Sequence, residues 1–402
     1  MEALSDTRVV LISGARQTGK STLAMSIART EHPAEFITLD DEGQRAAAQA
    51  DPRGFLARRT GPIVIDEIQR VPQLLLAIKM AVDRDNTPGR FLLTGSANIL
   101  TAPRVMDSLA GRIEIVTLWP LSQGELAGVA DSFVDAVLDG APPNVAPAAI
   151  DFHGMAEVIA RGGFPEVVAR GTRARRRRWF ESYLQSMVER DIQDLADVRR
   201  SDEFGRLLRL IATRVGNILQ PANLAHDLAI SRFTVESYIG LLETLYVVRR
   251  LPAWRAGLGA RVVHAPKAYL VDSGLLAYLL NADAERIVDD VRISGMVLES
   301  FVAMEVLRQL EWSKDRVFLY HFRDKDDHEV DLVMESARGR VAGIEVKASA
   351  TVLQHDFKGL RRLKRLAGER FSCGVILYMG EHRISFGDGL WAIPVGALWA
   401  PD

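Results

Sequence analysis

Apolar and polar positions alternate in short blocks through the N-terminal part of the chain. Residues Arg8 to Ser13 (RVVLIS) form an apolar, β-branched run typical of a buried parallel strand, and Ser21 to Arg29 has the pattern of the helix that should follow. Later runs predict strands at Glu35 to Leu39, Ile63 to Ile65 and Arg90 to Leu93. This pattern predicts a parallel α/β core.

The middle of the chain has a helical pattern. A basic run at Arg173 to Arg178 (RARRRR) leads into one predicted helix, and Phe204 to Thr213 forms another. Between Asn223 and Glu243, apolar residues recur at helical spacing on both sides of Ser231, which can cap the second helix. A strand at Tyr246 to Leu251 would complete a winged-helix module.

Two alternatives stay open for the basic and helical features of the middle region. Arg232, Thr234 and Ser237 lie on the leading turn of the second helix, where they could contact DNA, but the same module could pack only as a lid or an adaptor. The run at Arg173 to Arg178 is either a solvated helix face or a phosphate-binding patch. A further basic stretch, Lys358 to Arg370, is expected to contribute to nucleic-acid binding.

The last third returns to mixed helices and strands. This part of the chain begins near Lys267 to Val271, and an amphipathic helix is predicted at Met296 to Leu310. Strands then follow at Val317 to Phe322, Glu329 to Met334 and Val341 to Lys347. We therefore predict a mixed α/β domain here.

Linker-like composition and length divide the chain into three predicted domains. The chain has 402 residues, which is long for a single core, and a Pro- and Ala-rich stretch follows Gly140. We predict a parallel α/β core at 1–140, a helical and winged-helix module at 141–265, and a mixed α/β domain at 266–402.

Composition excludes some classes of protein. The chain is 48% hydrophobic and 25% charged, without an apolar run long enough to span a bilayer, so no membrane partner is expected. Cys373 is the single cysteine, which excludes an intrachain disulfide and favours the cytoplasm. A net charge of -2 argues against a wholly basic nucleic-acid binder but allows local basic faces.

A phosphate-binding loop follows the first predicted strand. The sequence from Gly14 to Thr22, GARQTGKST, matches G-x-x-x-x-G-K-[ST] in full. The backbone N–H groups of such a loop face the phosphates, Lys20 would reach the terminal phosphates, and Ser21 would ligate Mg²⁺. The expected nucleotide contacts are Gly14, Ala15, Gln17, Thr18, Gly19, Lys20, Ser21 and Thr22.

Acidic and polar residues end the next predicted strands. Asp66 and Glu67 follow Ile63-Val64-Ile65 in a Walker B pattern, in which the first acid holds Mg²⁺ and the second polarises the attacking water. Thr94, Ser96 or Asn98, after the strand that begins at Arg90, could sense the γ-phosphate.

Charged residues also alternate on the C-terminal strands. Glu345 and Lys347 share a strand face because side chains at i and i+2 point the same way, and Asp331 lies on the strand before. Two carboxylates could hold Mg²⁺ against a phosphate while the lysine activates water. A structural ion-pair cluster is the competing interpretation.

These motifs resemble two known families. The segments GARQTGKST, IVIDEIQR, FLLTGSAN and Leu109-Ala110-Gly111-Arg112 resemble AAA+ ATPases, specifically a bacterial and archaeal group with an appended nuclease-like domain. That resemblance implies that Arg112 acts on the γ-phosphate, in trans if subunits assemble into a homo-oligomer. The C-terminal acids resemble the PD-(D/E)XK nucleases, and Glu299 matches the helix acid that often completes such a metal site. Val330 stands where those nucleases often have proline.

The leading hypothesis is an ATPase that requires ATP and Mg²⁺ and couples turnover to DNA binding or cleavage. The nuclease-like site could use Mg²⁺ or Mn²⁺. One alternative is a nucleotide-switched regulatory or scaffold protein with a non-catalytic C-terminal domain. A small-molecule kinase is a weaker alternative because of the winged helix and the large C-terminal domain.

Overall fold

The computed structural model describes residues 1–95, 109–143, 150–187, 201–257 and 265–400. The chain forms two compact units: unit 1 comprises Met1–Trp119 with Thr244–Tyr246, and unit 2 comprises Pro120–Glu243 with Val247–Asp402. The boundary at Trp119 lies before the predicted one at residue 140. The predicted division of the remaining chain into two domains stays a prediction.

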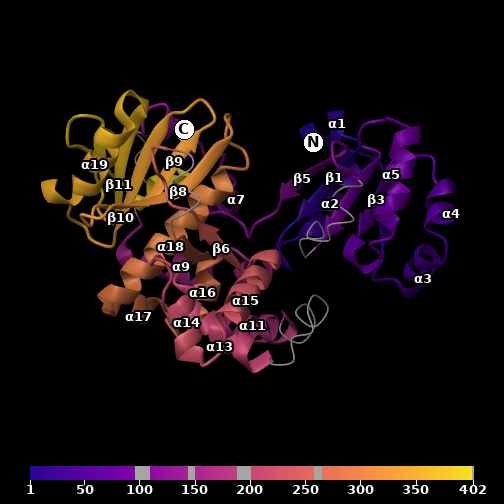
Figure 1. Ribbon diagram of the computed structural model, residues 1–402, viewed down its shortest axis with the longest axis horizontal. Helices are drawn as coiled ribbons and strands as arrows, with labels where there is room; N and C mark the ends of the chain where they lie inside the picture. The colour runs from indigo at the N-terminus through magenta and orange to yellow at the C-terminus, as the bar shows by residue number, and fades with distance from the viewer. Residues whose placement is uncertain (96–108, 144–149, 188–200, 258–264, 401–402) are drawn as a thin grey trace. The chain divides into compact units, whose positions relative to one another are not determined.

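Unit 1 is built on a parallel five-stranded sheet with the order β2-β3-β4-β1-β5 (Figure 1). Its strands are β1 (Val9–Ser13), β2 (Glu35–Thr38), β3 (Ile63–Asp66), β4 (Phe91–Gly95) and β5 (Ile113–Thr117). Its helices are α1 (Glu2–Asp6), α2 (Lys20–Thr30), α3 (Glu42–Ala50), α4 (Pro52–Ala57) and α5 (Leu74–Arg84), with a 3₁₀ turn at Ile68–Arg70. The predicted parallel α/β core is confirmed.

Both faces of β1, which lies between β4 and β5 in the sheet, are buried, and this explains its continuous apolar sequence. Val9 and Leu11 pack into one core with residues of α5, whereas Val10 and Ile12 pack into a second core with Ala24 of α2. Successive strand residues point to opposite faces, so helices must cover both sides of the sheet. Because these strands are parallel, the carboxyl ends of β1, β3 and β4 lie together at one edge of the sheet. Ligands of open parallel sheets bind at this edge.

The first part of unit 2 is helical. It contains α7 (Gln123–Ala127), α8 (Phe133–Leu138), α9 (Phe152–Arg161), α10 (Pro165–Val168), α11 (Arg173–Ser186), α13 (Ser201–Ala212), α14 (Pro221–Leu228) and α15 (Arg232–Thr244). The helix pair α14–α15 occupies the segment predicted as a helix-turn-helix. Ala229 has φ +55° in the turn, and the predicted cap is confirmed because the Thr234 N–H donates to Ser231 Oγ at 3.0 Å. Strands β6 (Val248–Leu251) and β7 (Lys267–Leu270) then pair antiparallel.

The second part of unit 2 contains a mixed six-stranded sheet of order β12-β13-β11-β10-β9-β8. The strands are β8 (Val317–Arg323), β9 (Glu329–Ser336), β10 (Val341–Lys347), β11 (Phe371–Tyr378), β12 (Ile384–Ser385) and β13 (Leu390–Pro394). The helices are α16 (Ser273–Leu279), α17 (Ala284–Asp289), α18 (Val291–Gln309) and α19 (Lys358–Ala367), with 3₁₀ turns at Gln354–Phe357, Gly368–Arg370 and Val395–Trp399. The predicted mixed α/β character of this region is confirmed.

The amphipathic helix α19 covers this sheet closely. A Cβ added to Gly343 of β10 would lie 2.6 Å from Leu360 and 2.7 Å from Leu363, so glycine allows the helix to approach the sheet. Among the described residues, none of the helices combines the length and the apolar character needed to cross a bilayer.

Candidate active site

The loop between β1 and α2 contains backbone dihedral angles that favour glycine. Gly14 has φ +153° and Gly19 has φ +95°, and Gln17 also has positive φ. A Cβ added to Gly14 would lie 2.2 Å from the backbone oxygen of Leu118 on the neighbouring chain segment. Glycine is therefore required at the first position of the loop both by its dihedral angle and by this close approach.

Polar side chains hold the loop in its curled form. The Lys20 Nζ donates to the backbone oxygens of Gly14 at 3.1 Å and Ala15 at 2.6 Å, and its side chain is buried. Thr18 Oγ1 also donates to Ala15 O at 2.9 Å. The ammonium thus lies over the loop that would enclose a phosphate. Of the remaining predicted contacts, Gln17 and Thr22 are exposed.

Three hydroxyl groups converge on the carboxylate of Asp66, at the end of β3. Ser21 Oγ and Thr94 Oγ1 donate to Asp66 Oδ1 at 2.6 Å each, and Thr38 Oγ1 donates to Oδ2 at 3.1 Å. A buried carboxylate beside a hydroxyl is the oxygen-ligand set that suits Mg²⁺, so Ser21 and Asp66 fit the predicted metal role. Thr94 contacts Asp66, whereas Ser96 and Asn98 lie outside the described residues.

Glu67 occupies a strained backbone position beside this carboxylate. It has φ +59° in the left-handed region, which costs a residue other than glycine about 1 kcal/mol or more. Its N–H donates to Thr94 Oγ1 at 3.1 Å, and Gln69 Nε2 donates to its carboxylate. Burial, followed by repulsion from Asp66, raises the pKa of Glu67. A raised pKa brings a carboxylate closer to the range in which it can accept a proton from water.

Arg112 is not brought to the phosphate loop of its own chain. It immediately precedes β5, whose first residue Ile113 pairs in parallel with Val9, the first residue of β1. Arg112 therefore lies at the amino end of the sheet, about five residues or roughly 17 Å along the strand from the loop that follows Ser13. There it forms an ion pair with Asp83. A role for Arg112 at the γ-phosphate within one chain is inconsistent with this position, and only the version in trans stays a prediction.

The predicted C-terminal residues converge on neighbouring strands of unit 2. The antiparallel register of β9 and β10 pairs Leu332 with Ile344, so the next pair in this register is Asp331 with Glu345. Asp331 Oδ2 accepts the backbone N–H of Val346 at 2.9 Å. Glu345 Oε2 is buried without a hydrogen-bond partner.

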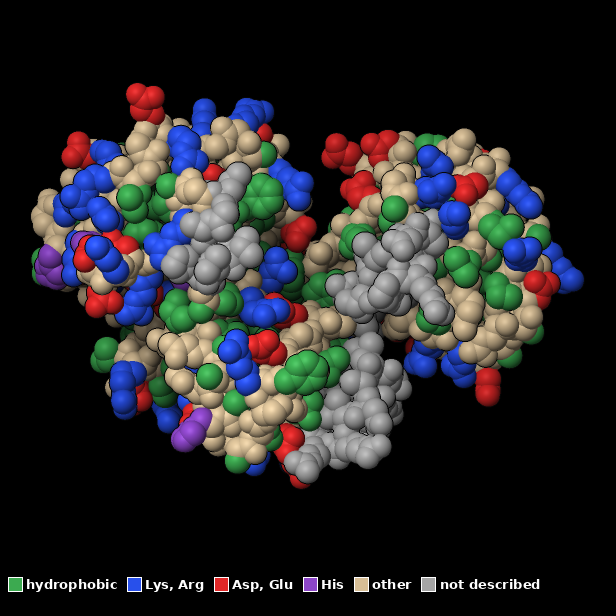
Figure 2. Space-filling model, viewed as in Figure 1, with side chains coloured by type: hydrophobic (Ala, Val, Ile, Leu, Met, Phe, Trp, Pro, Cys, Tyr) green, Lys and Arg blue, Asp and Glu red, His purple; other side chains and the backbone are tan. Residues whose placement is uncertain are grey.

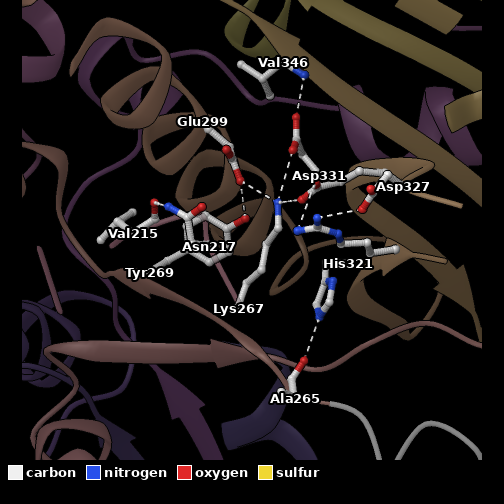
Figure 3. A network of polar contacts seen from close by, with 12 residues as sticks. Val215, Asn217, Ala265, Lys267, Tyr269, Glu299, His321, Asp327, Asp331 and Val346 are labelled. Atoms are coloured by element: carbon white, nitrogen blue, oxygen red, sulfur yellow. Dashed lines mark hydrogen bonds and ion pairs between the residues drawn. The ribbon is translucent and has the colours of Figure 1, made fainter. Parts of the chain in front are cut away.

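A buried lysine lies among these acids (Figure 3). Lys267 of β7 is 1% exposed, and its Nζ lies 3.0 Å from Glu299 Oε1, 2.8 Å from Glu329 Oε1 and 3.2 Å from Asp331 Oδ1. Tyr269, two residues further along β7, donates its hydroxyl to Glu299 Oε1 at 2.7 Å. Although desolvation alone would lower it, Asp331 and the other anionic neighbours raise the pKa of Lys267 well above its ordinary value.

The acidic cluster, defined as Glu299, Glu329, Asp331 and Glu345, carries more negative charge than Lys267 can neutralise. Burial and then Asp331 raise the pKa of Glu299 to about 7, and the same two causes raise that of Glu345 well above its ordinary value. The orphaned Glu345 oxygen beside Asp331 fits a second cation with a preference for oxygen ligands.

Sequence reasoning missed Lys267, Tyr269 and Glu329. The sequence analysis uses Lys267 only to mark where the last third of the chain begins. A lysine at the start of an apolar strand was the available signal, because a buried ammonium requires acidic partners. The predicted Lys347 forms an ion pair with Asp356 at 3.5 Å, and its charge also acts to lower the pKa of Glu345.

The predicted basic stretches are partly neutralised by acids. On α19, Arg362 pairs with Asp324 at 2.9 Å, and Arg370 beyond it pairs with Glu335 at 3.0 Å. On the visible face, Lys and Arg side chains lie interspersed with Asp and Glu (Figure 2). The group Asp324, Asp326 and His328 could in principle gather ligands around a metal. Asp324, however, already accepts hydrogen bonds from His328 and Arg362.

The sheet order, the curled glycine loop and the contact between Ser21 and Asp66 are those of a P-loop domain. The comparison with family models agrees, since residues 6–127 match a family described as an AAA domain. Two other matches are each described as a domain of unknown function: DUF8612 over residues 153–286 and DUF4143 over residues 294–398.

The chain belongs to the same family as two mycobacterial proteins. It is 31% identical over 399 residues to the uncharacterized protein Rv2008c of Mycobacterium tuberculosis, an alignment that covers 98% of this chain and 82% of the relative. The uncharacterized protein Mb2031c of Mycobacterium bovis matches with the same identity and the same coverage. The similarity extends through both units, so the three matched regions occur together in this family.

Proposed function

We propose that unit 1 binds and hydrolyses ATP with Mg²⁺. The observation that supports this most strongly is the 2.6 Å contact between Ser21 Oγ and Asp66 Oδ1, next to the buried ammonium of Lys20. In this proposal Ser21 and Asp66 hold the metal, directly or through water, and Lys20 leaves the loop carbonyls to reach the terminal phosphates. The bound ion would supply charge neutralisation on the phosphates.

In the same proposal Glu67 orients the attacking water and accepts its proton. Its raised pKa and its fixed position beside Asp66 support this role, because a general base must be both placed and tuned. Thr94 would hold Asp66 and the Glu67 backbone together, since it bonds to both.

The test measures nucleotide binding and phosphate release separately. Lys20→Ala should lose ATP binding. Glu67→Gln should bind ATP normally, but its rate of phosphate release should fall by a factor of about 100 or more. Lys79→Ala is a control because Lys79 is partly exposed on α5 and forms only a weak surface ion pair, with 3.9 Å between its Nζ and Asp83. Wild-type binding and turnover in both site variants would refute the proposal.

We further propose that unit 2 contacts nucleic acid and that its acidic cluster supports metal-dependent cleavage of a phosphodiester. The buried, unpartnered Glu345 Oε2 next to Asp331 favours a divalent cation, either Mg²⁺ or Mn²⁺, and the exposed Arg232 and Ser237 on α15 favour a winged-helix contact with DNA. Asp331, Glu345 and Glu299 would hold the ion, and Lys347 would act on water.

The position of Lys267 favours the alternative, a regulatory or scaffold protein whose C-terminal cluster is structural. Cleavage of labelled single- and double-stranded DNA by wild type, Asp331→Asn and Glu345→Gln, with Mg²⁺ and with Mn²⁺, separates the two. Cleavage that both substitutions abolish supports a nuclease. No cleavage by the wild type with either metal supports the scaffold.

A further inference from the structure

A cavity of about 140 Å³ lies in unit 2 between α9, α11, α16 and the turn before α17. Small side chains and two aromatic rings line its inner wall: Ala160, Phe180, Gly274, Ala277, Tyr278 and Ala282. The two ring centroids are 5.7 Å apart, and the backbone of α9 contacts Gly274 so closely that an added Cβ would lie 2.6 Å from Arg161 O. Small residues therefore leave a hollow about as large as a cavity that accepts benzene.

The mouth of this cavity is cationic. Arg173, Arg176 and Arg177 of α11 line it, and their i, i+3 and i+4 spacing places them on one face of the helix. Arg175 and Arg178, from the same basic run, do not line the cavity. The run RARRRR thus presents three of its guanidinium groups to one site.

Acidic neighbours neutralise this mouth incompletely. Asp283 and Glu157 also line the cavity. Arg173 is 3.3 Å from Asp283 and 4.0 Å from Glu285, and Arg176 is 4.0 Å from Glu157; all of these side chains are partly exposed to water, so each pair is weak. Arg177 forms no ion pair with any residue in the ranges that the structure describes. The mouth therefore retains positive charge directly above an apolar wall.

We propose that this cavity binds a small phosphate monoester that carries a ring-sized apolar group. The ring would occupy the hollow beside Phe180 and Tyr278, and the phosphate would accept hydrogen bonds from the guanidinium groups at the mouth. Arginine suits this role because its planar fork matches two oxygens of a phosphate at once. This site is separate from the nucleotide site proposed in unit 1, since every lining residue belongs to unit 2.

The probe for the test is 4-fluorophenyl phosphate, observed by fluorine NMR line broadening with the full-length chain at near-physiological salt. All arms carry Lys20→Ala, which removes the phosphate loop as a competing phosphate site. Inorganic phosphate and 4-fluorobenzyl alcohol each supply one half of the proposed ligand. Arg177→Gln tests the mouth, and Arg178→Gln is the matched control on the same helix.

The proposal expects binding of 4-fluorophenyl phosphate that Arg177→Gln weakens about tenfold and Arg178→Gln leaves unchanged. Inorganic phosphate should compete at least tenfold more weakly, because it leaves the hollow empty. Three results would overturn the proposal: no binding of the probe, equal weakening by the two arginine substitutions, or inorganic phosphate that competes as well as the probe. Binding of the neutral alcohol as tightly as the phosphate would likewise exclude a role for the arginines.

Discussion

Replacing Lys267 by methionine should destabilise unit 2 in a pH-dependent way. The side chain keeps its length but loses an ammonium that lies within 3.2 Å of three carboxylates. At an effective dielectric constant of 20, each pair at 3 Å is worth about 5 kcal/mol before the desolvation cost of the ions is subtracted. Breaking a buried ion pair costs about 3–5 kcal/mol in practice, and we expect a loss of that size at pH 8.

The sign of the pH dependence follows from the raised pKa of Glu299. Its pKa is about 7 in the folded protein and about 4.5 when unfolded. A carboxyl group with a raised folded pKa contributes stability that is present below the unfolded pKa and is lost as the pH rises through the folded value. Removing Lys267 raises the folded pKa of Glu299 further, so the variant should lose stability more steeply than the wild type between pH 5 and 8.

Urea unfolding, followed by circular dichroism at pH 5.5 and pH 8, measures this effect. ADP with Mg²⁺ should raise the urea midpoint of unit 1, where it binds, so the transition whose midpoint does not change is assigned to unit 2. Lys364→Met is the control, because Lys364 is 40% exposed and makes only an exposed hydrogen bond to Asp388 O and a 4.0 Å ion pair with the carboxylate of the same residue. A Lys267→Met variant within 1 kcal/mol of the wild type at both pH values would refute the ionic network as a stabilising element. Recovery of stability with Mg²⁺ in this variant would support the metal site.

Two further predictions concern single buried positions. Gly14→Ala should abolish ATP binding and lower the melting temperature, because its Cβ would lie 2.2 Å from Leu118 O, whereas Gly61→Ala, with no atom within 4 Å, should change neither. Binding by Gly14→Ala that equals that of the wild type would contradict the loop geometry. Burial raises the pKa of Cys373 to about 12, so iodoacetamide at pH 8 should label it only after unfolding, as mass spectrometry can follow. Labelling of the folded chain as fast as in urea would contradict its burial.

The N-terminal unit could be predicted from sequence because its information is local. Each buried strand is a continuous apolar run, and the loop from Gly14 to Thr22 is a contiguous motif, so neither required knowledge of the tertiary structure. The contact of Ser21 with Asp66 follows because the ends of parallel strands meet at one edge.

Features that depend on strand direction or distant pairing could not be predicted in this way. Arg112 follows β4 in the sequence, but it directly precedes β5 and so lies at the opposite end of the strands from the phosphate-binding loop. Lys267 meets Asp331 only because β7 and β9, which are far apart in the sequence, are brought together in unit 2. No local pattern around Lys267 identifies its partners.

The buried network also limits how genes of this family can be recombined. Lys267 and Tyr269 lie in the region matched over residues 153–286, whereas Glu299, Asp331 and Glu345 lie in the region matched over residues 294–398. An exchange between these regions would separate an ammonium from its counter-charges and leave acids without their cation. Swaps that cut near residue 290 should therefore yield unstable hybrids unless both parents supply matching charges, so the two regions should be inherited as one block.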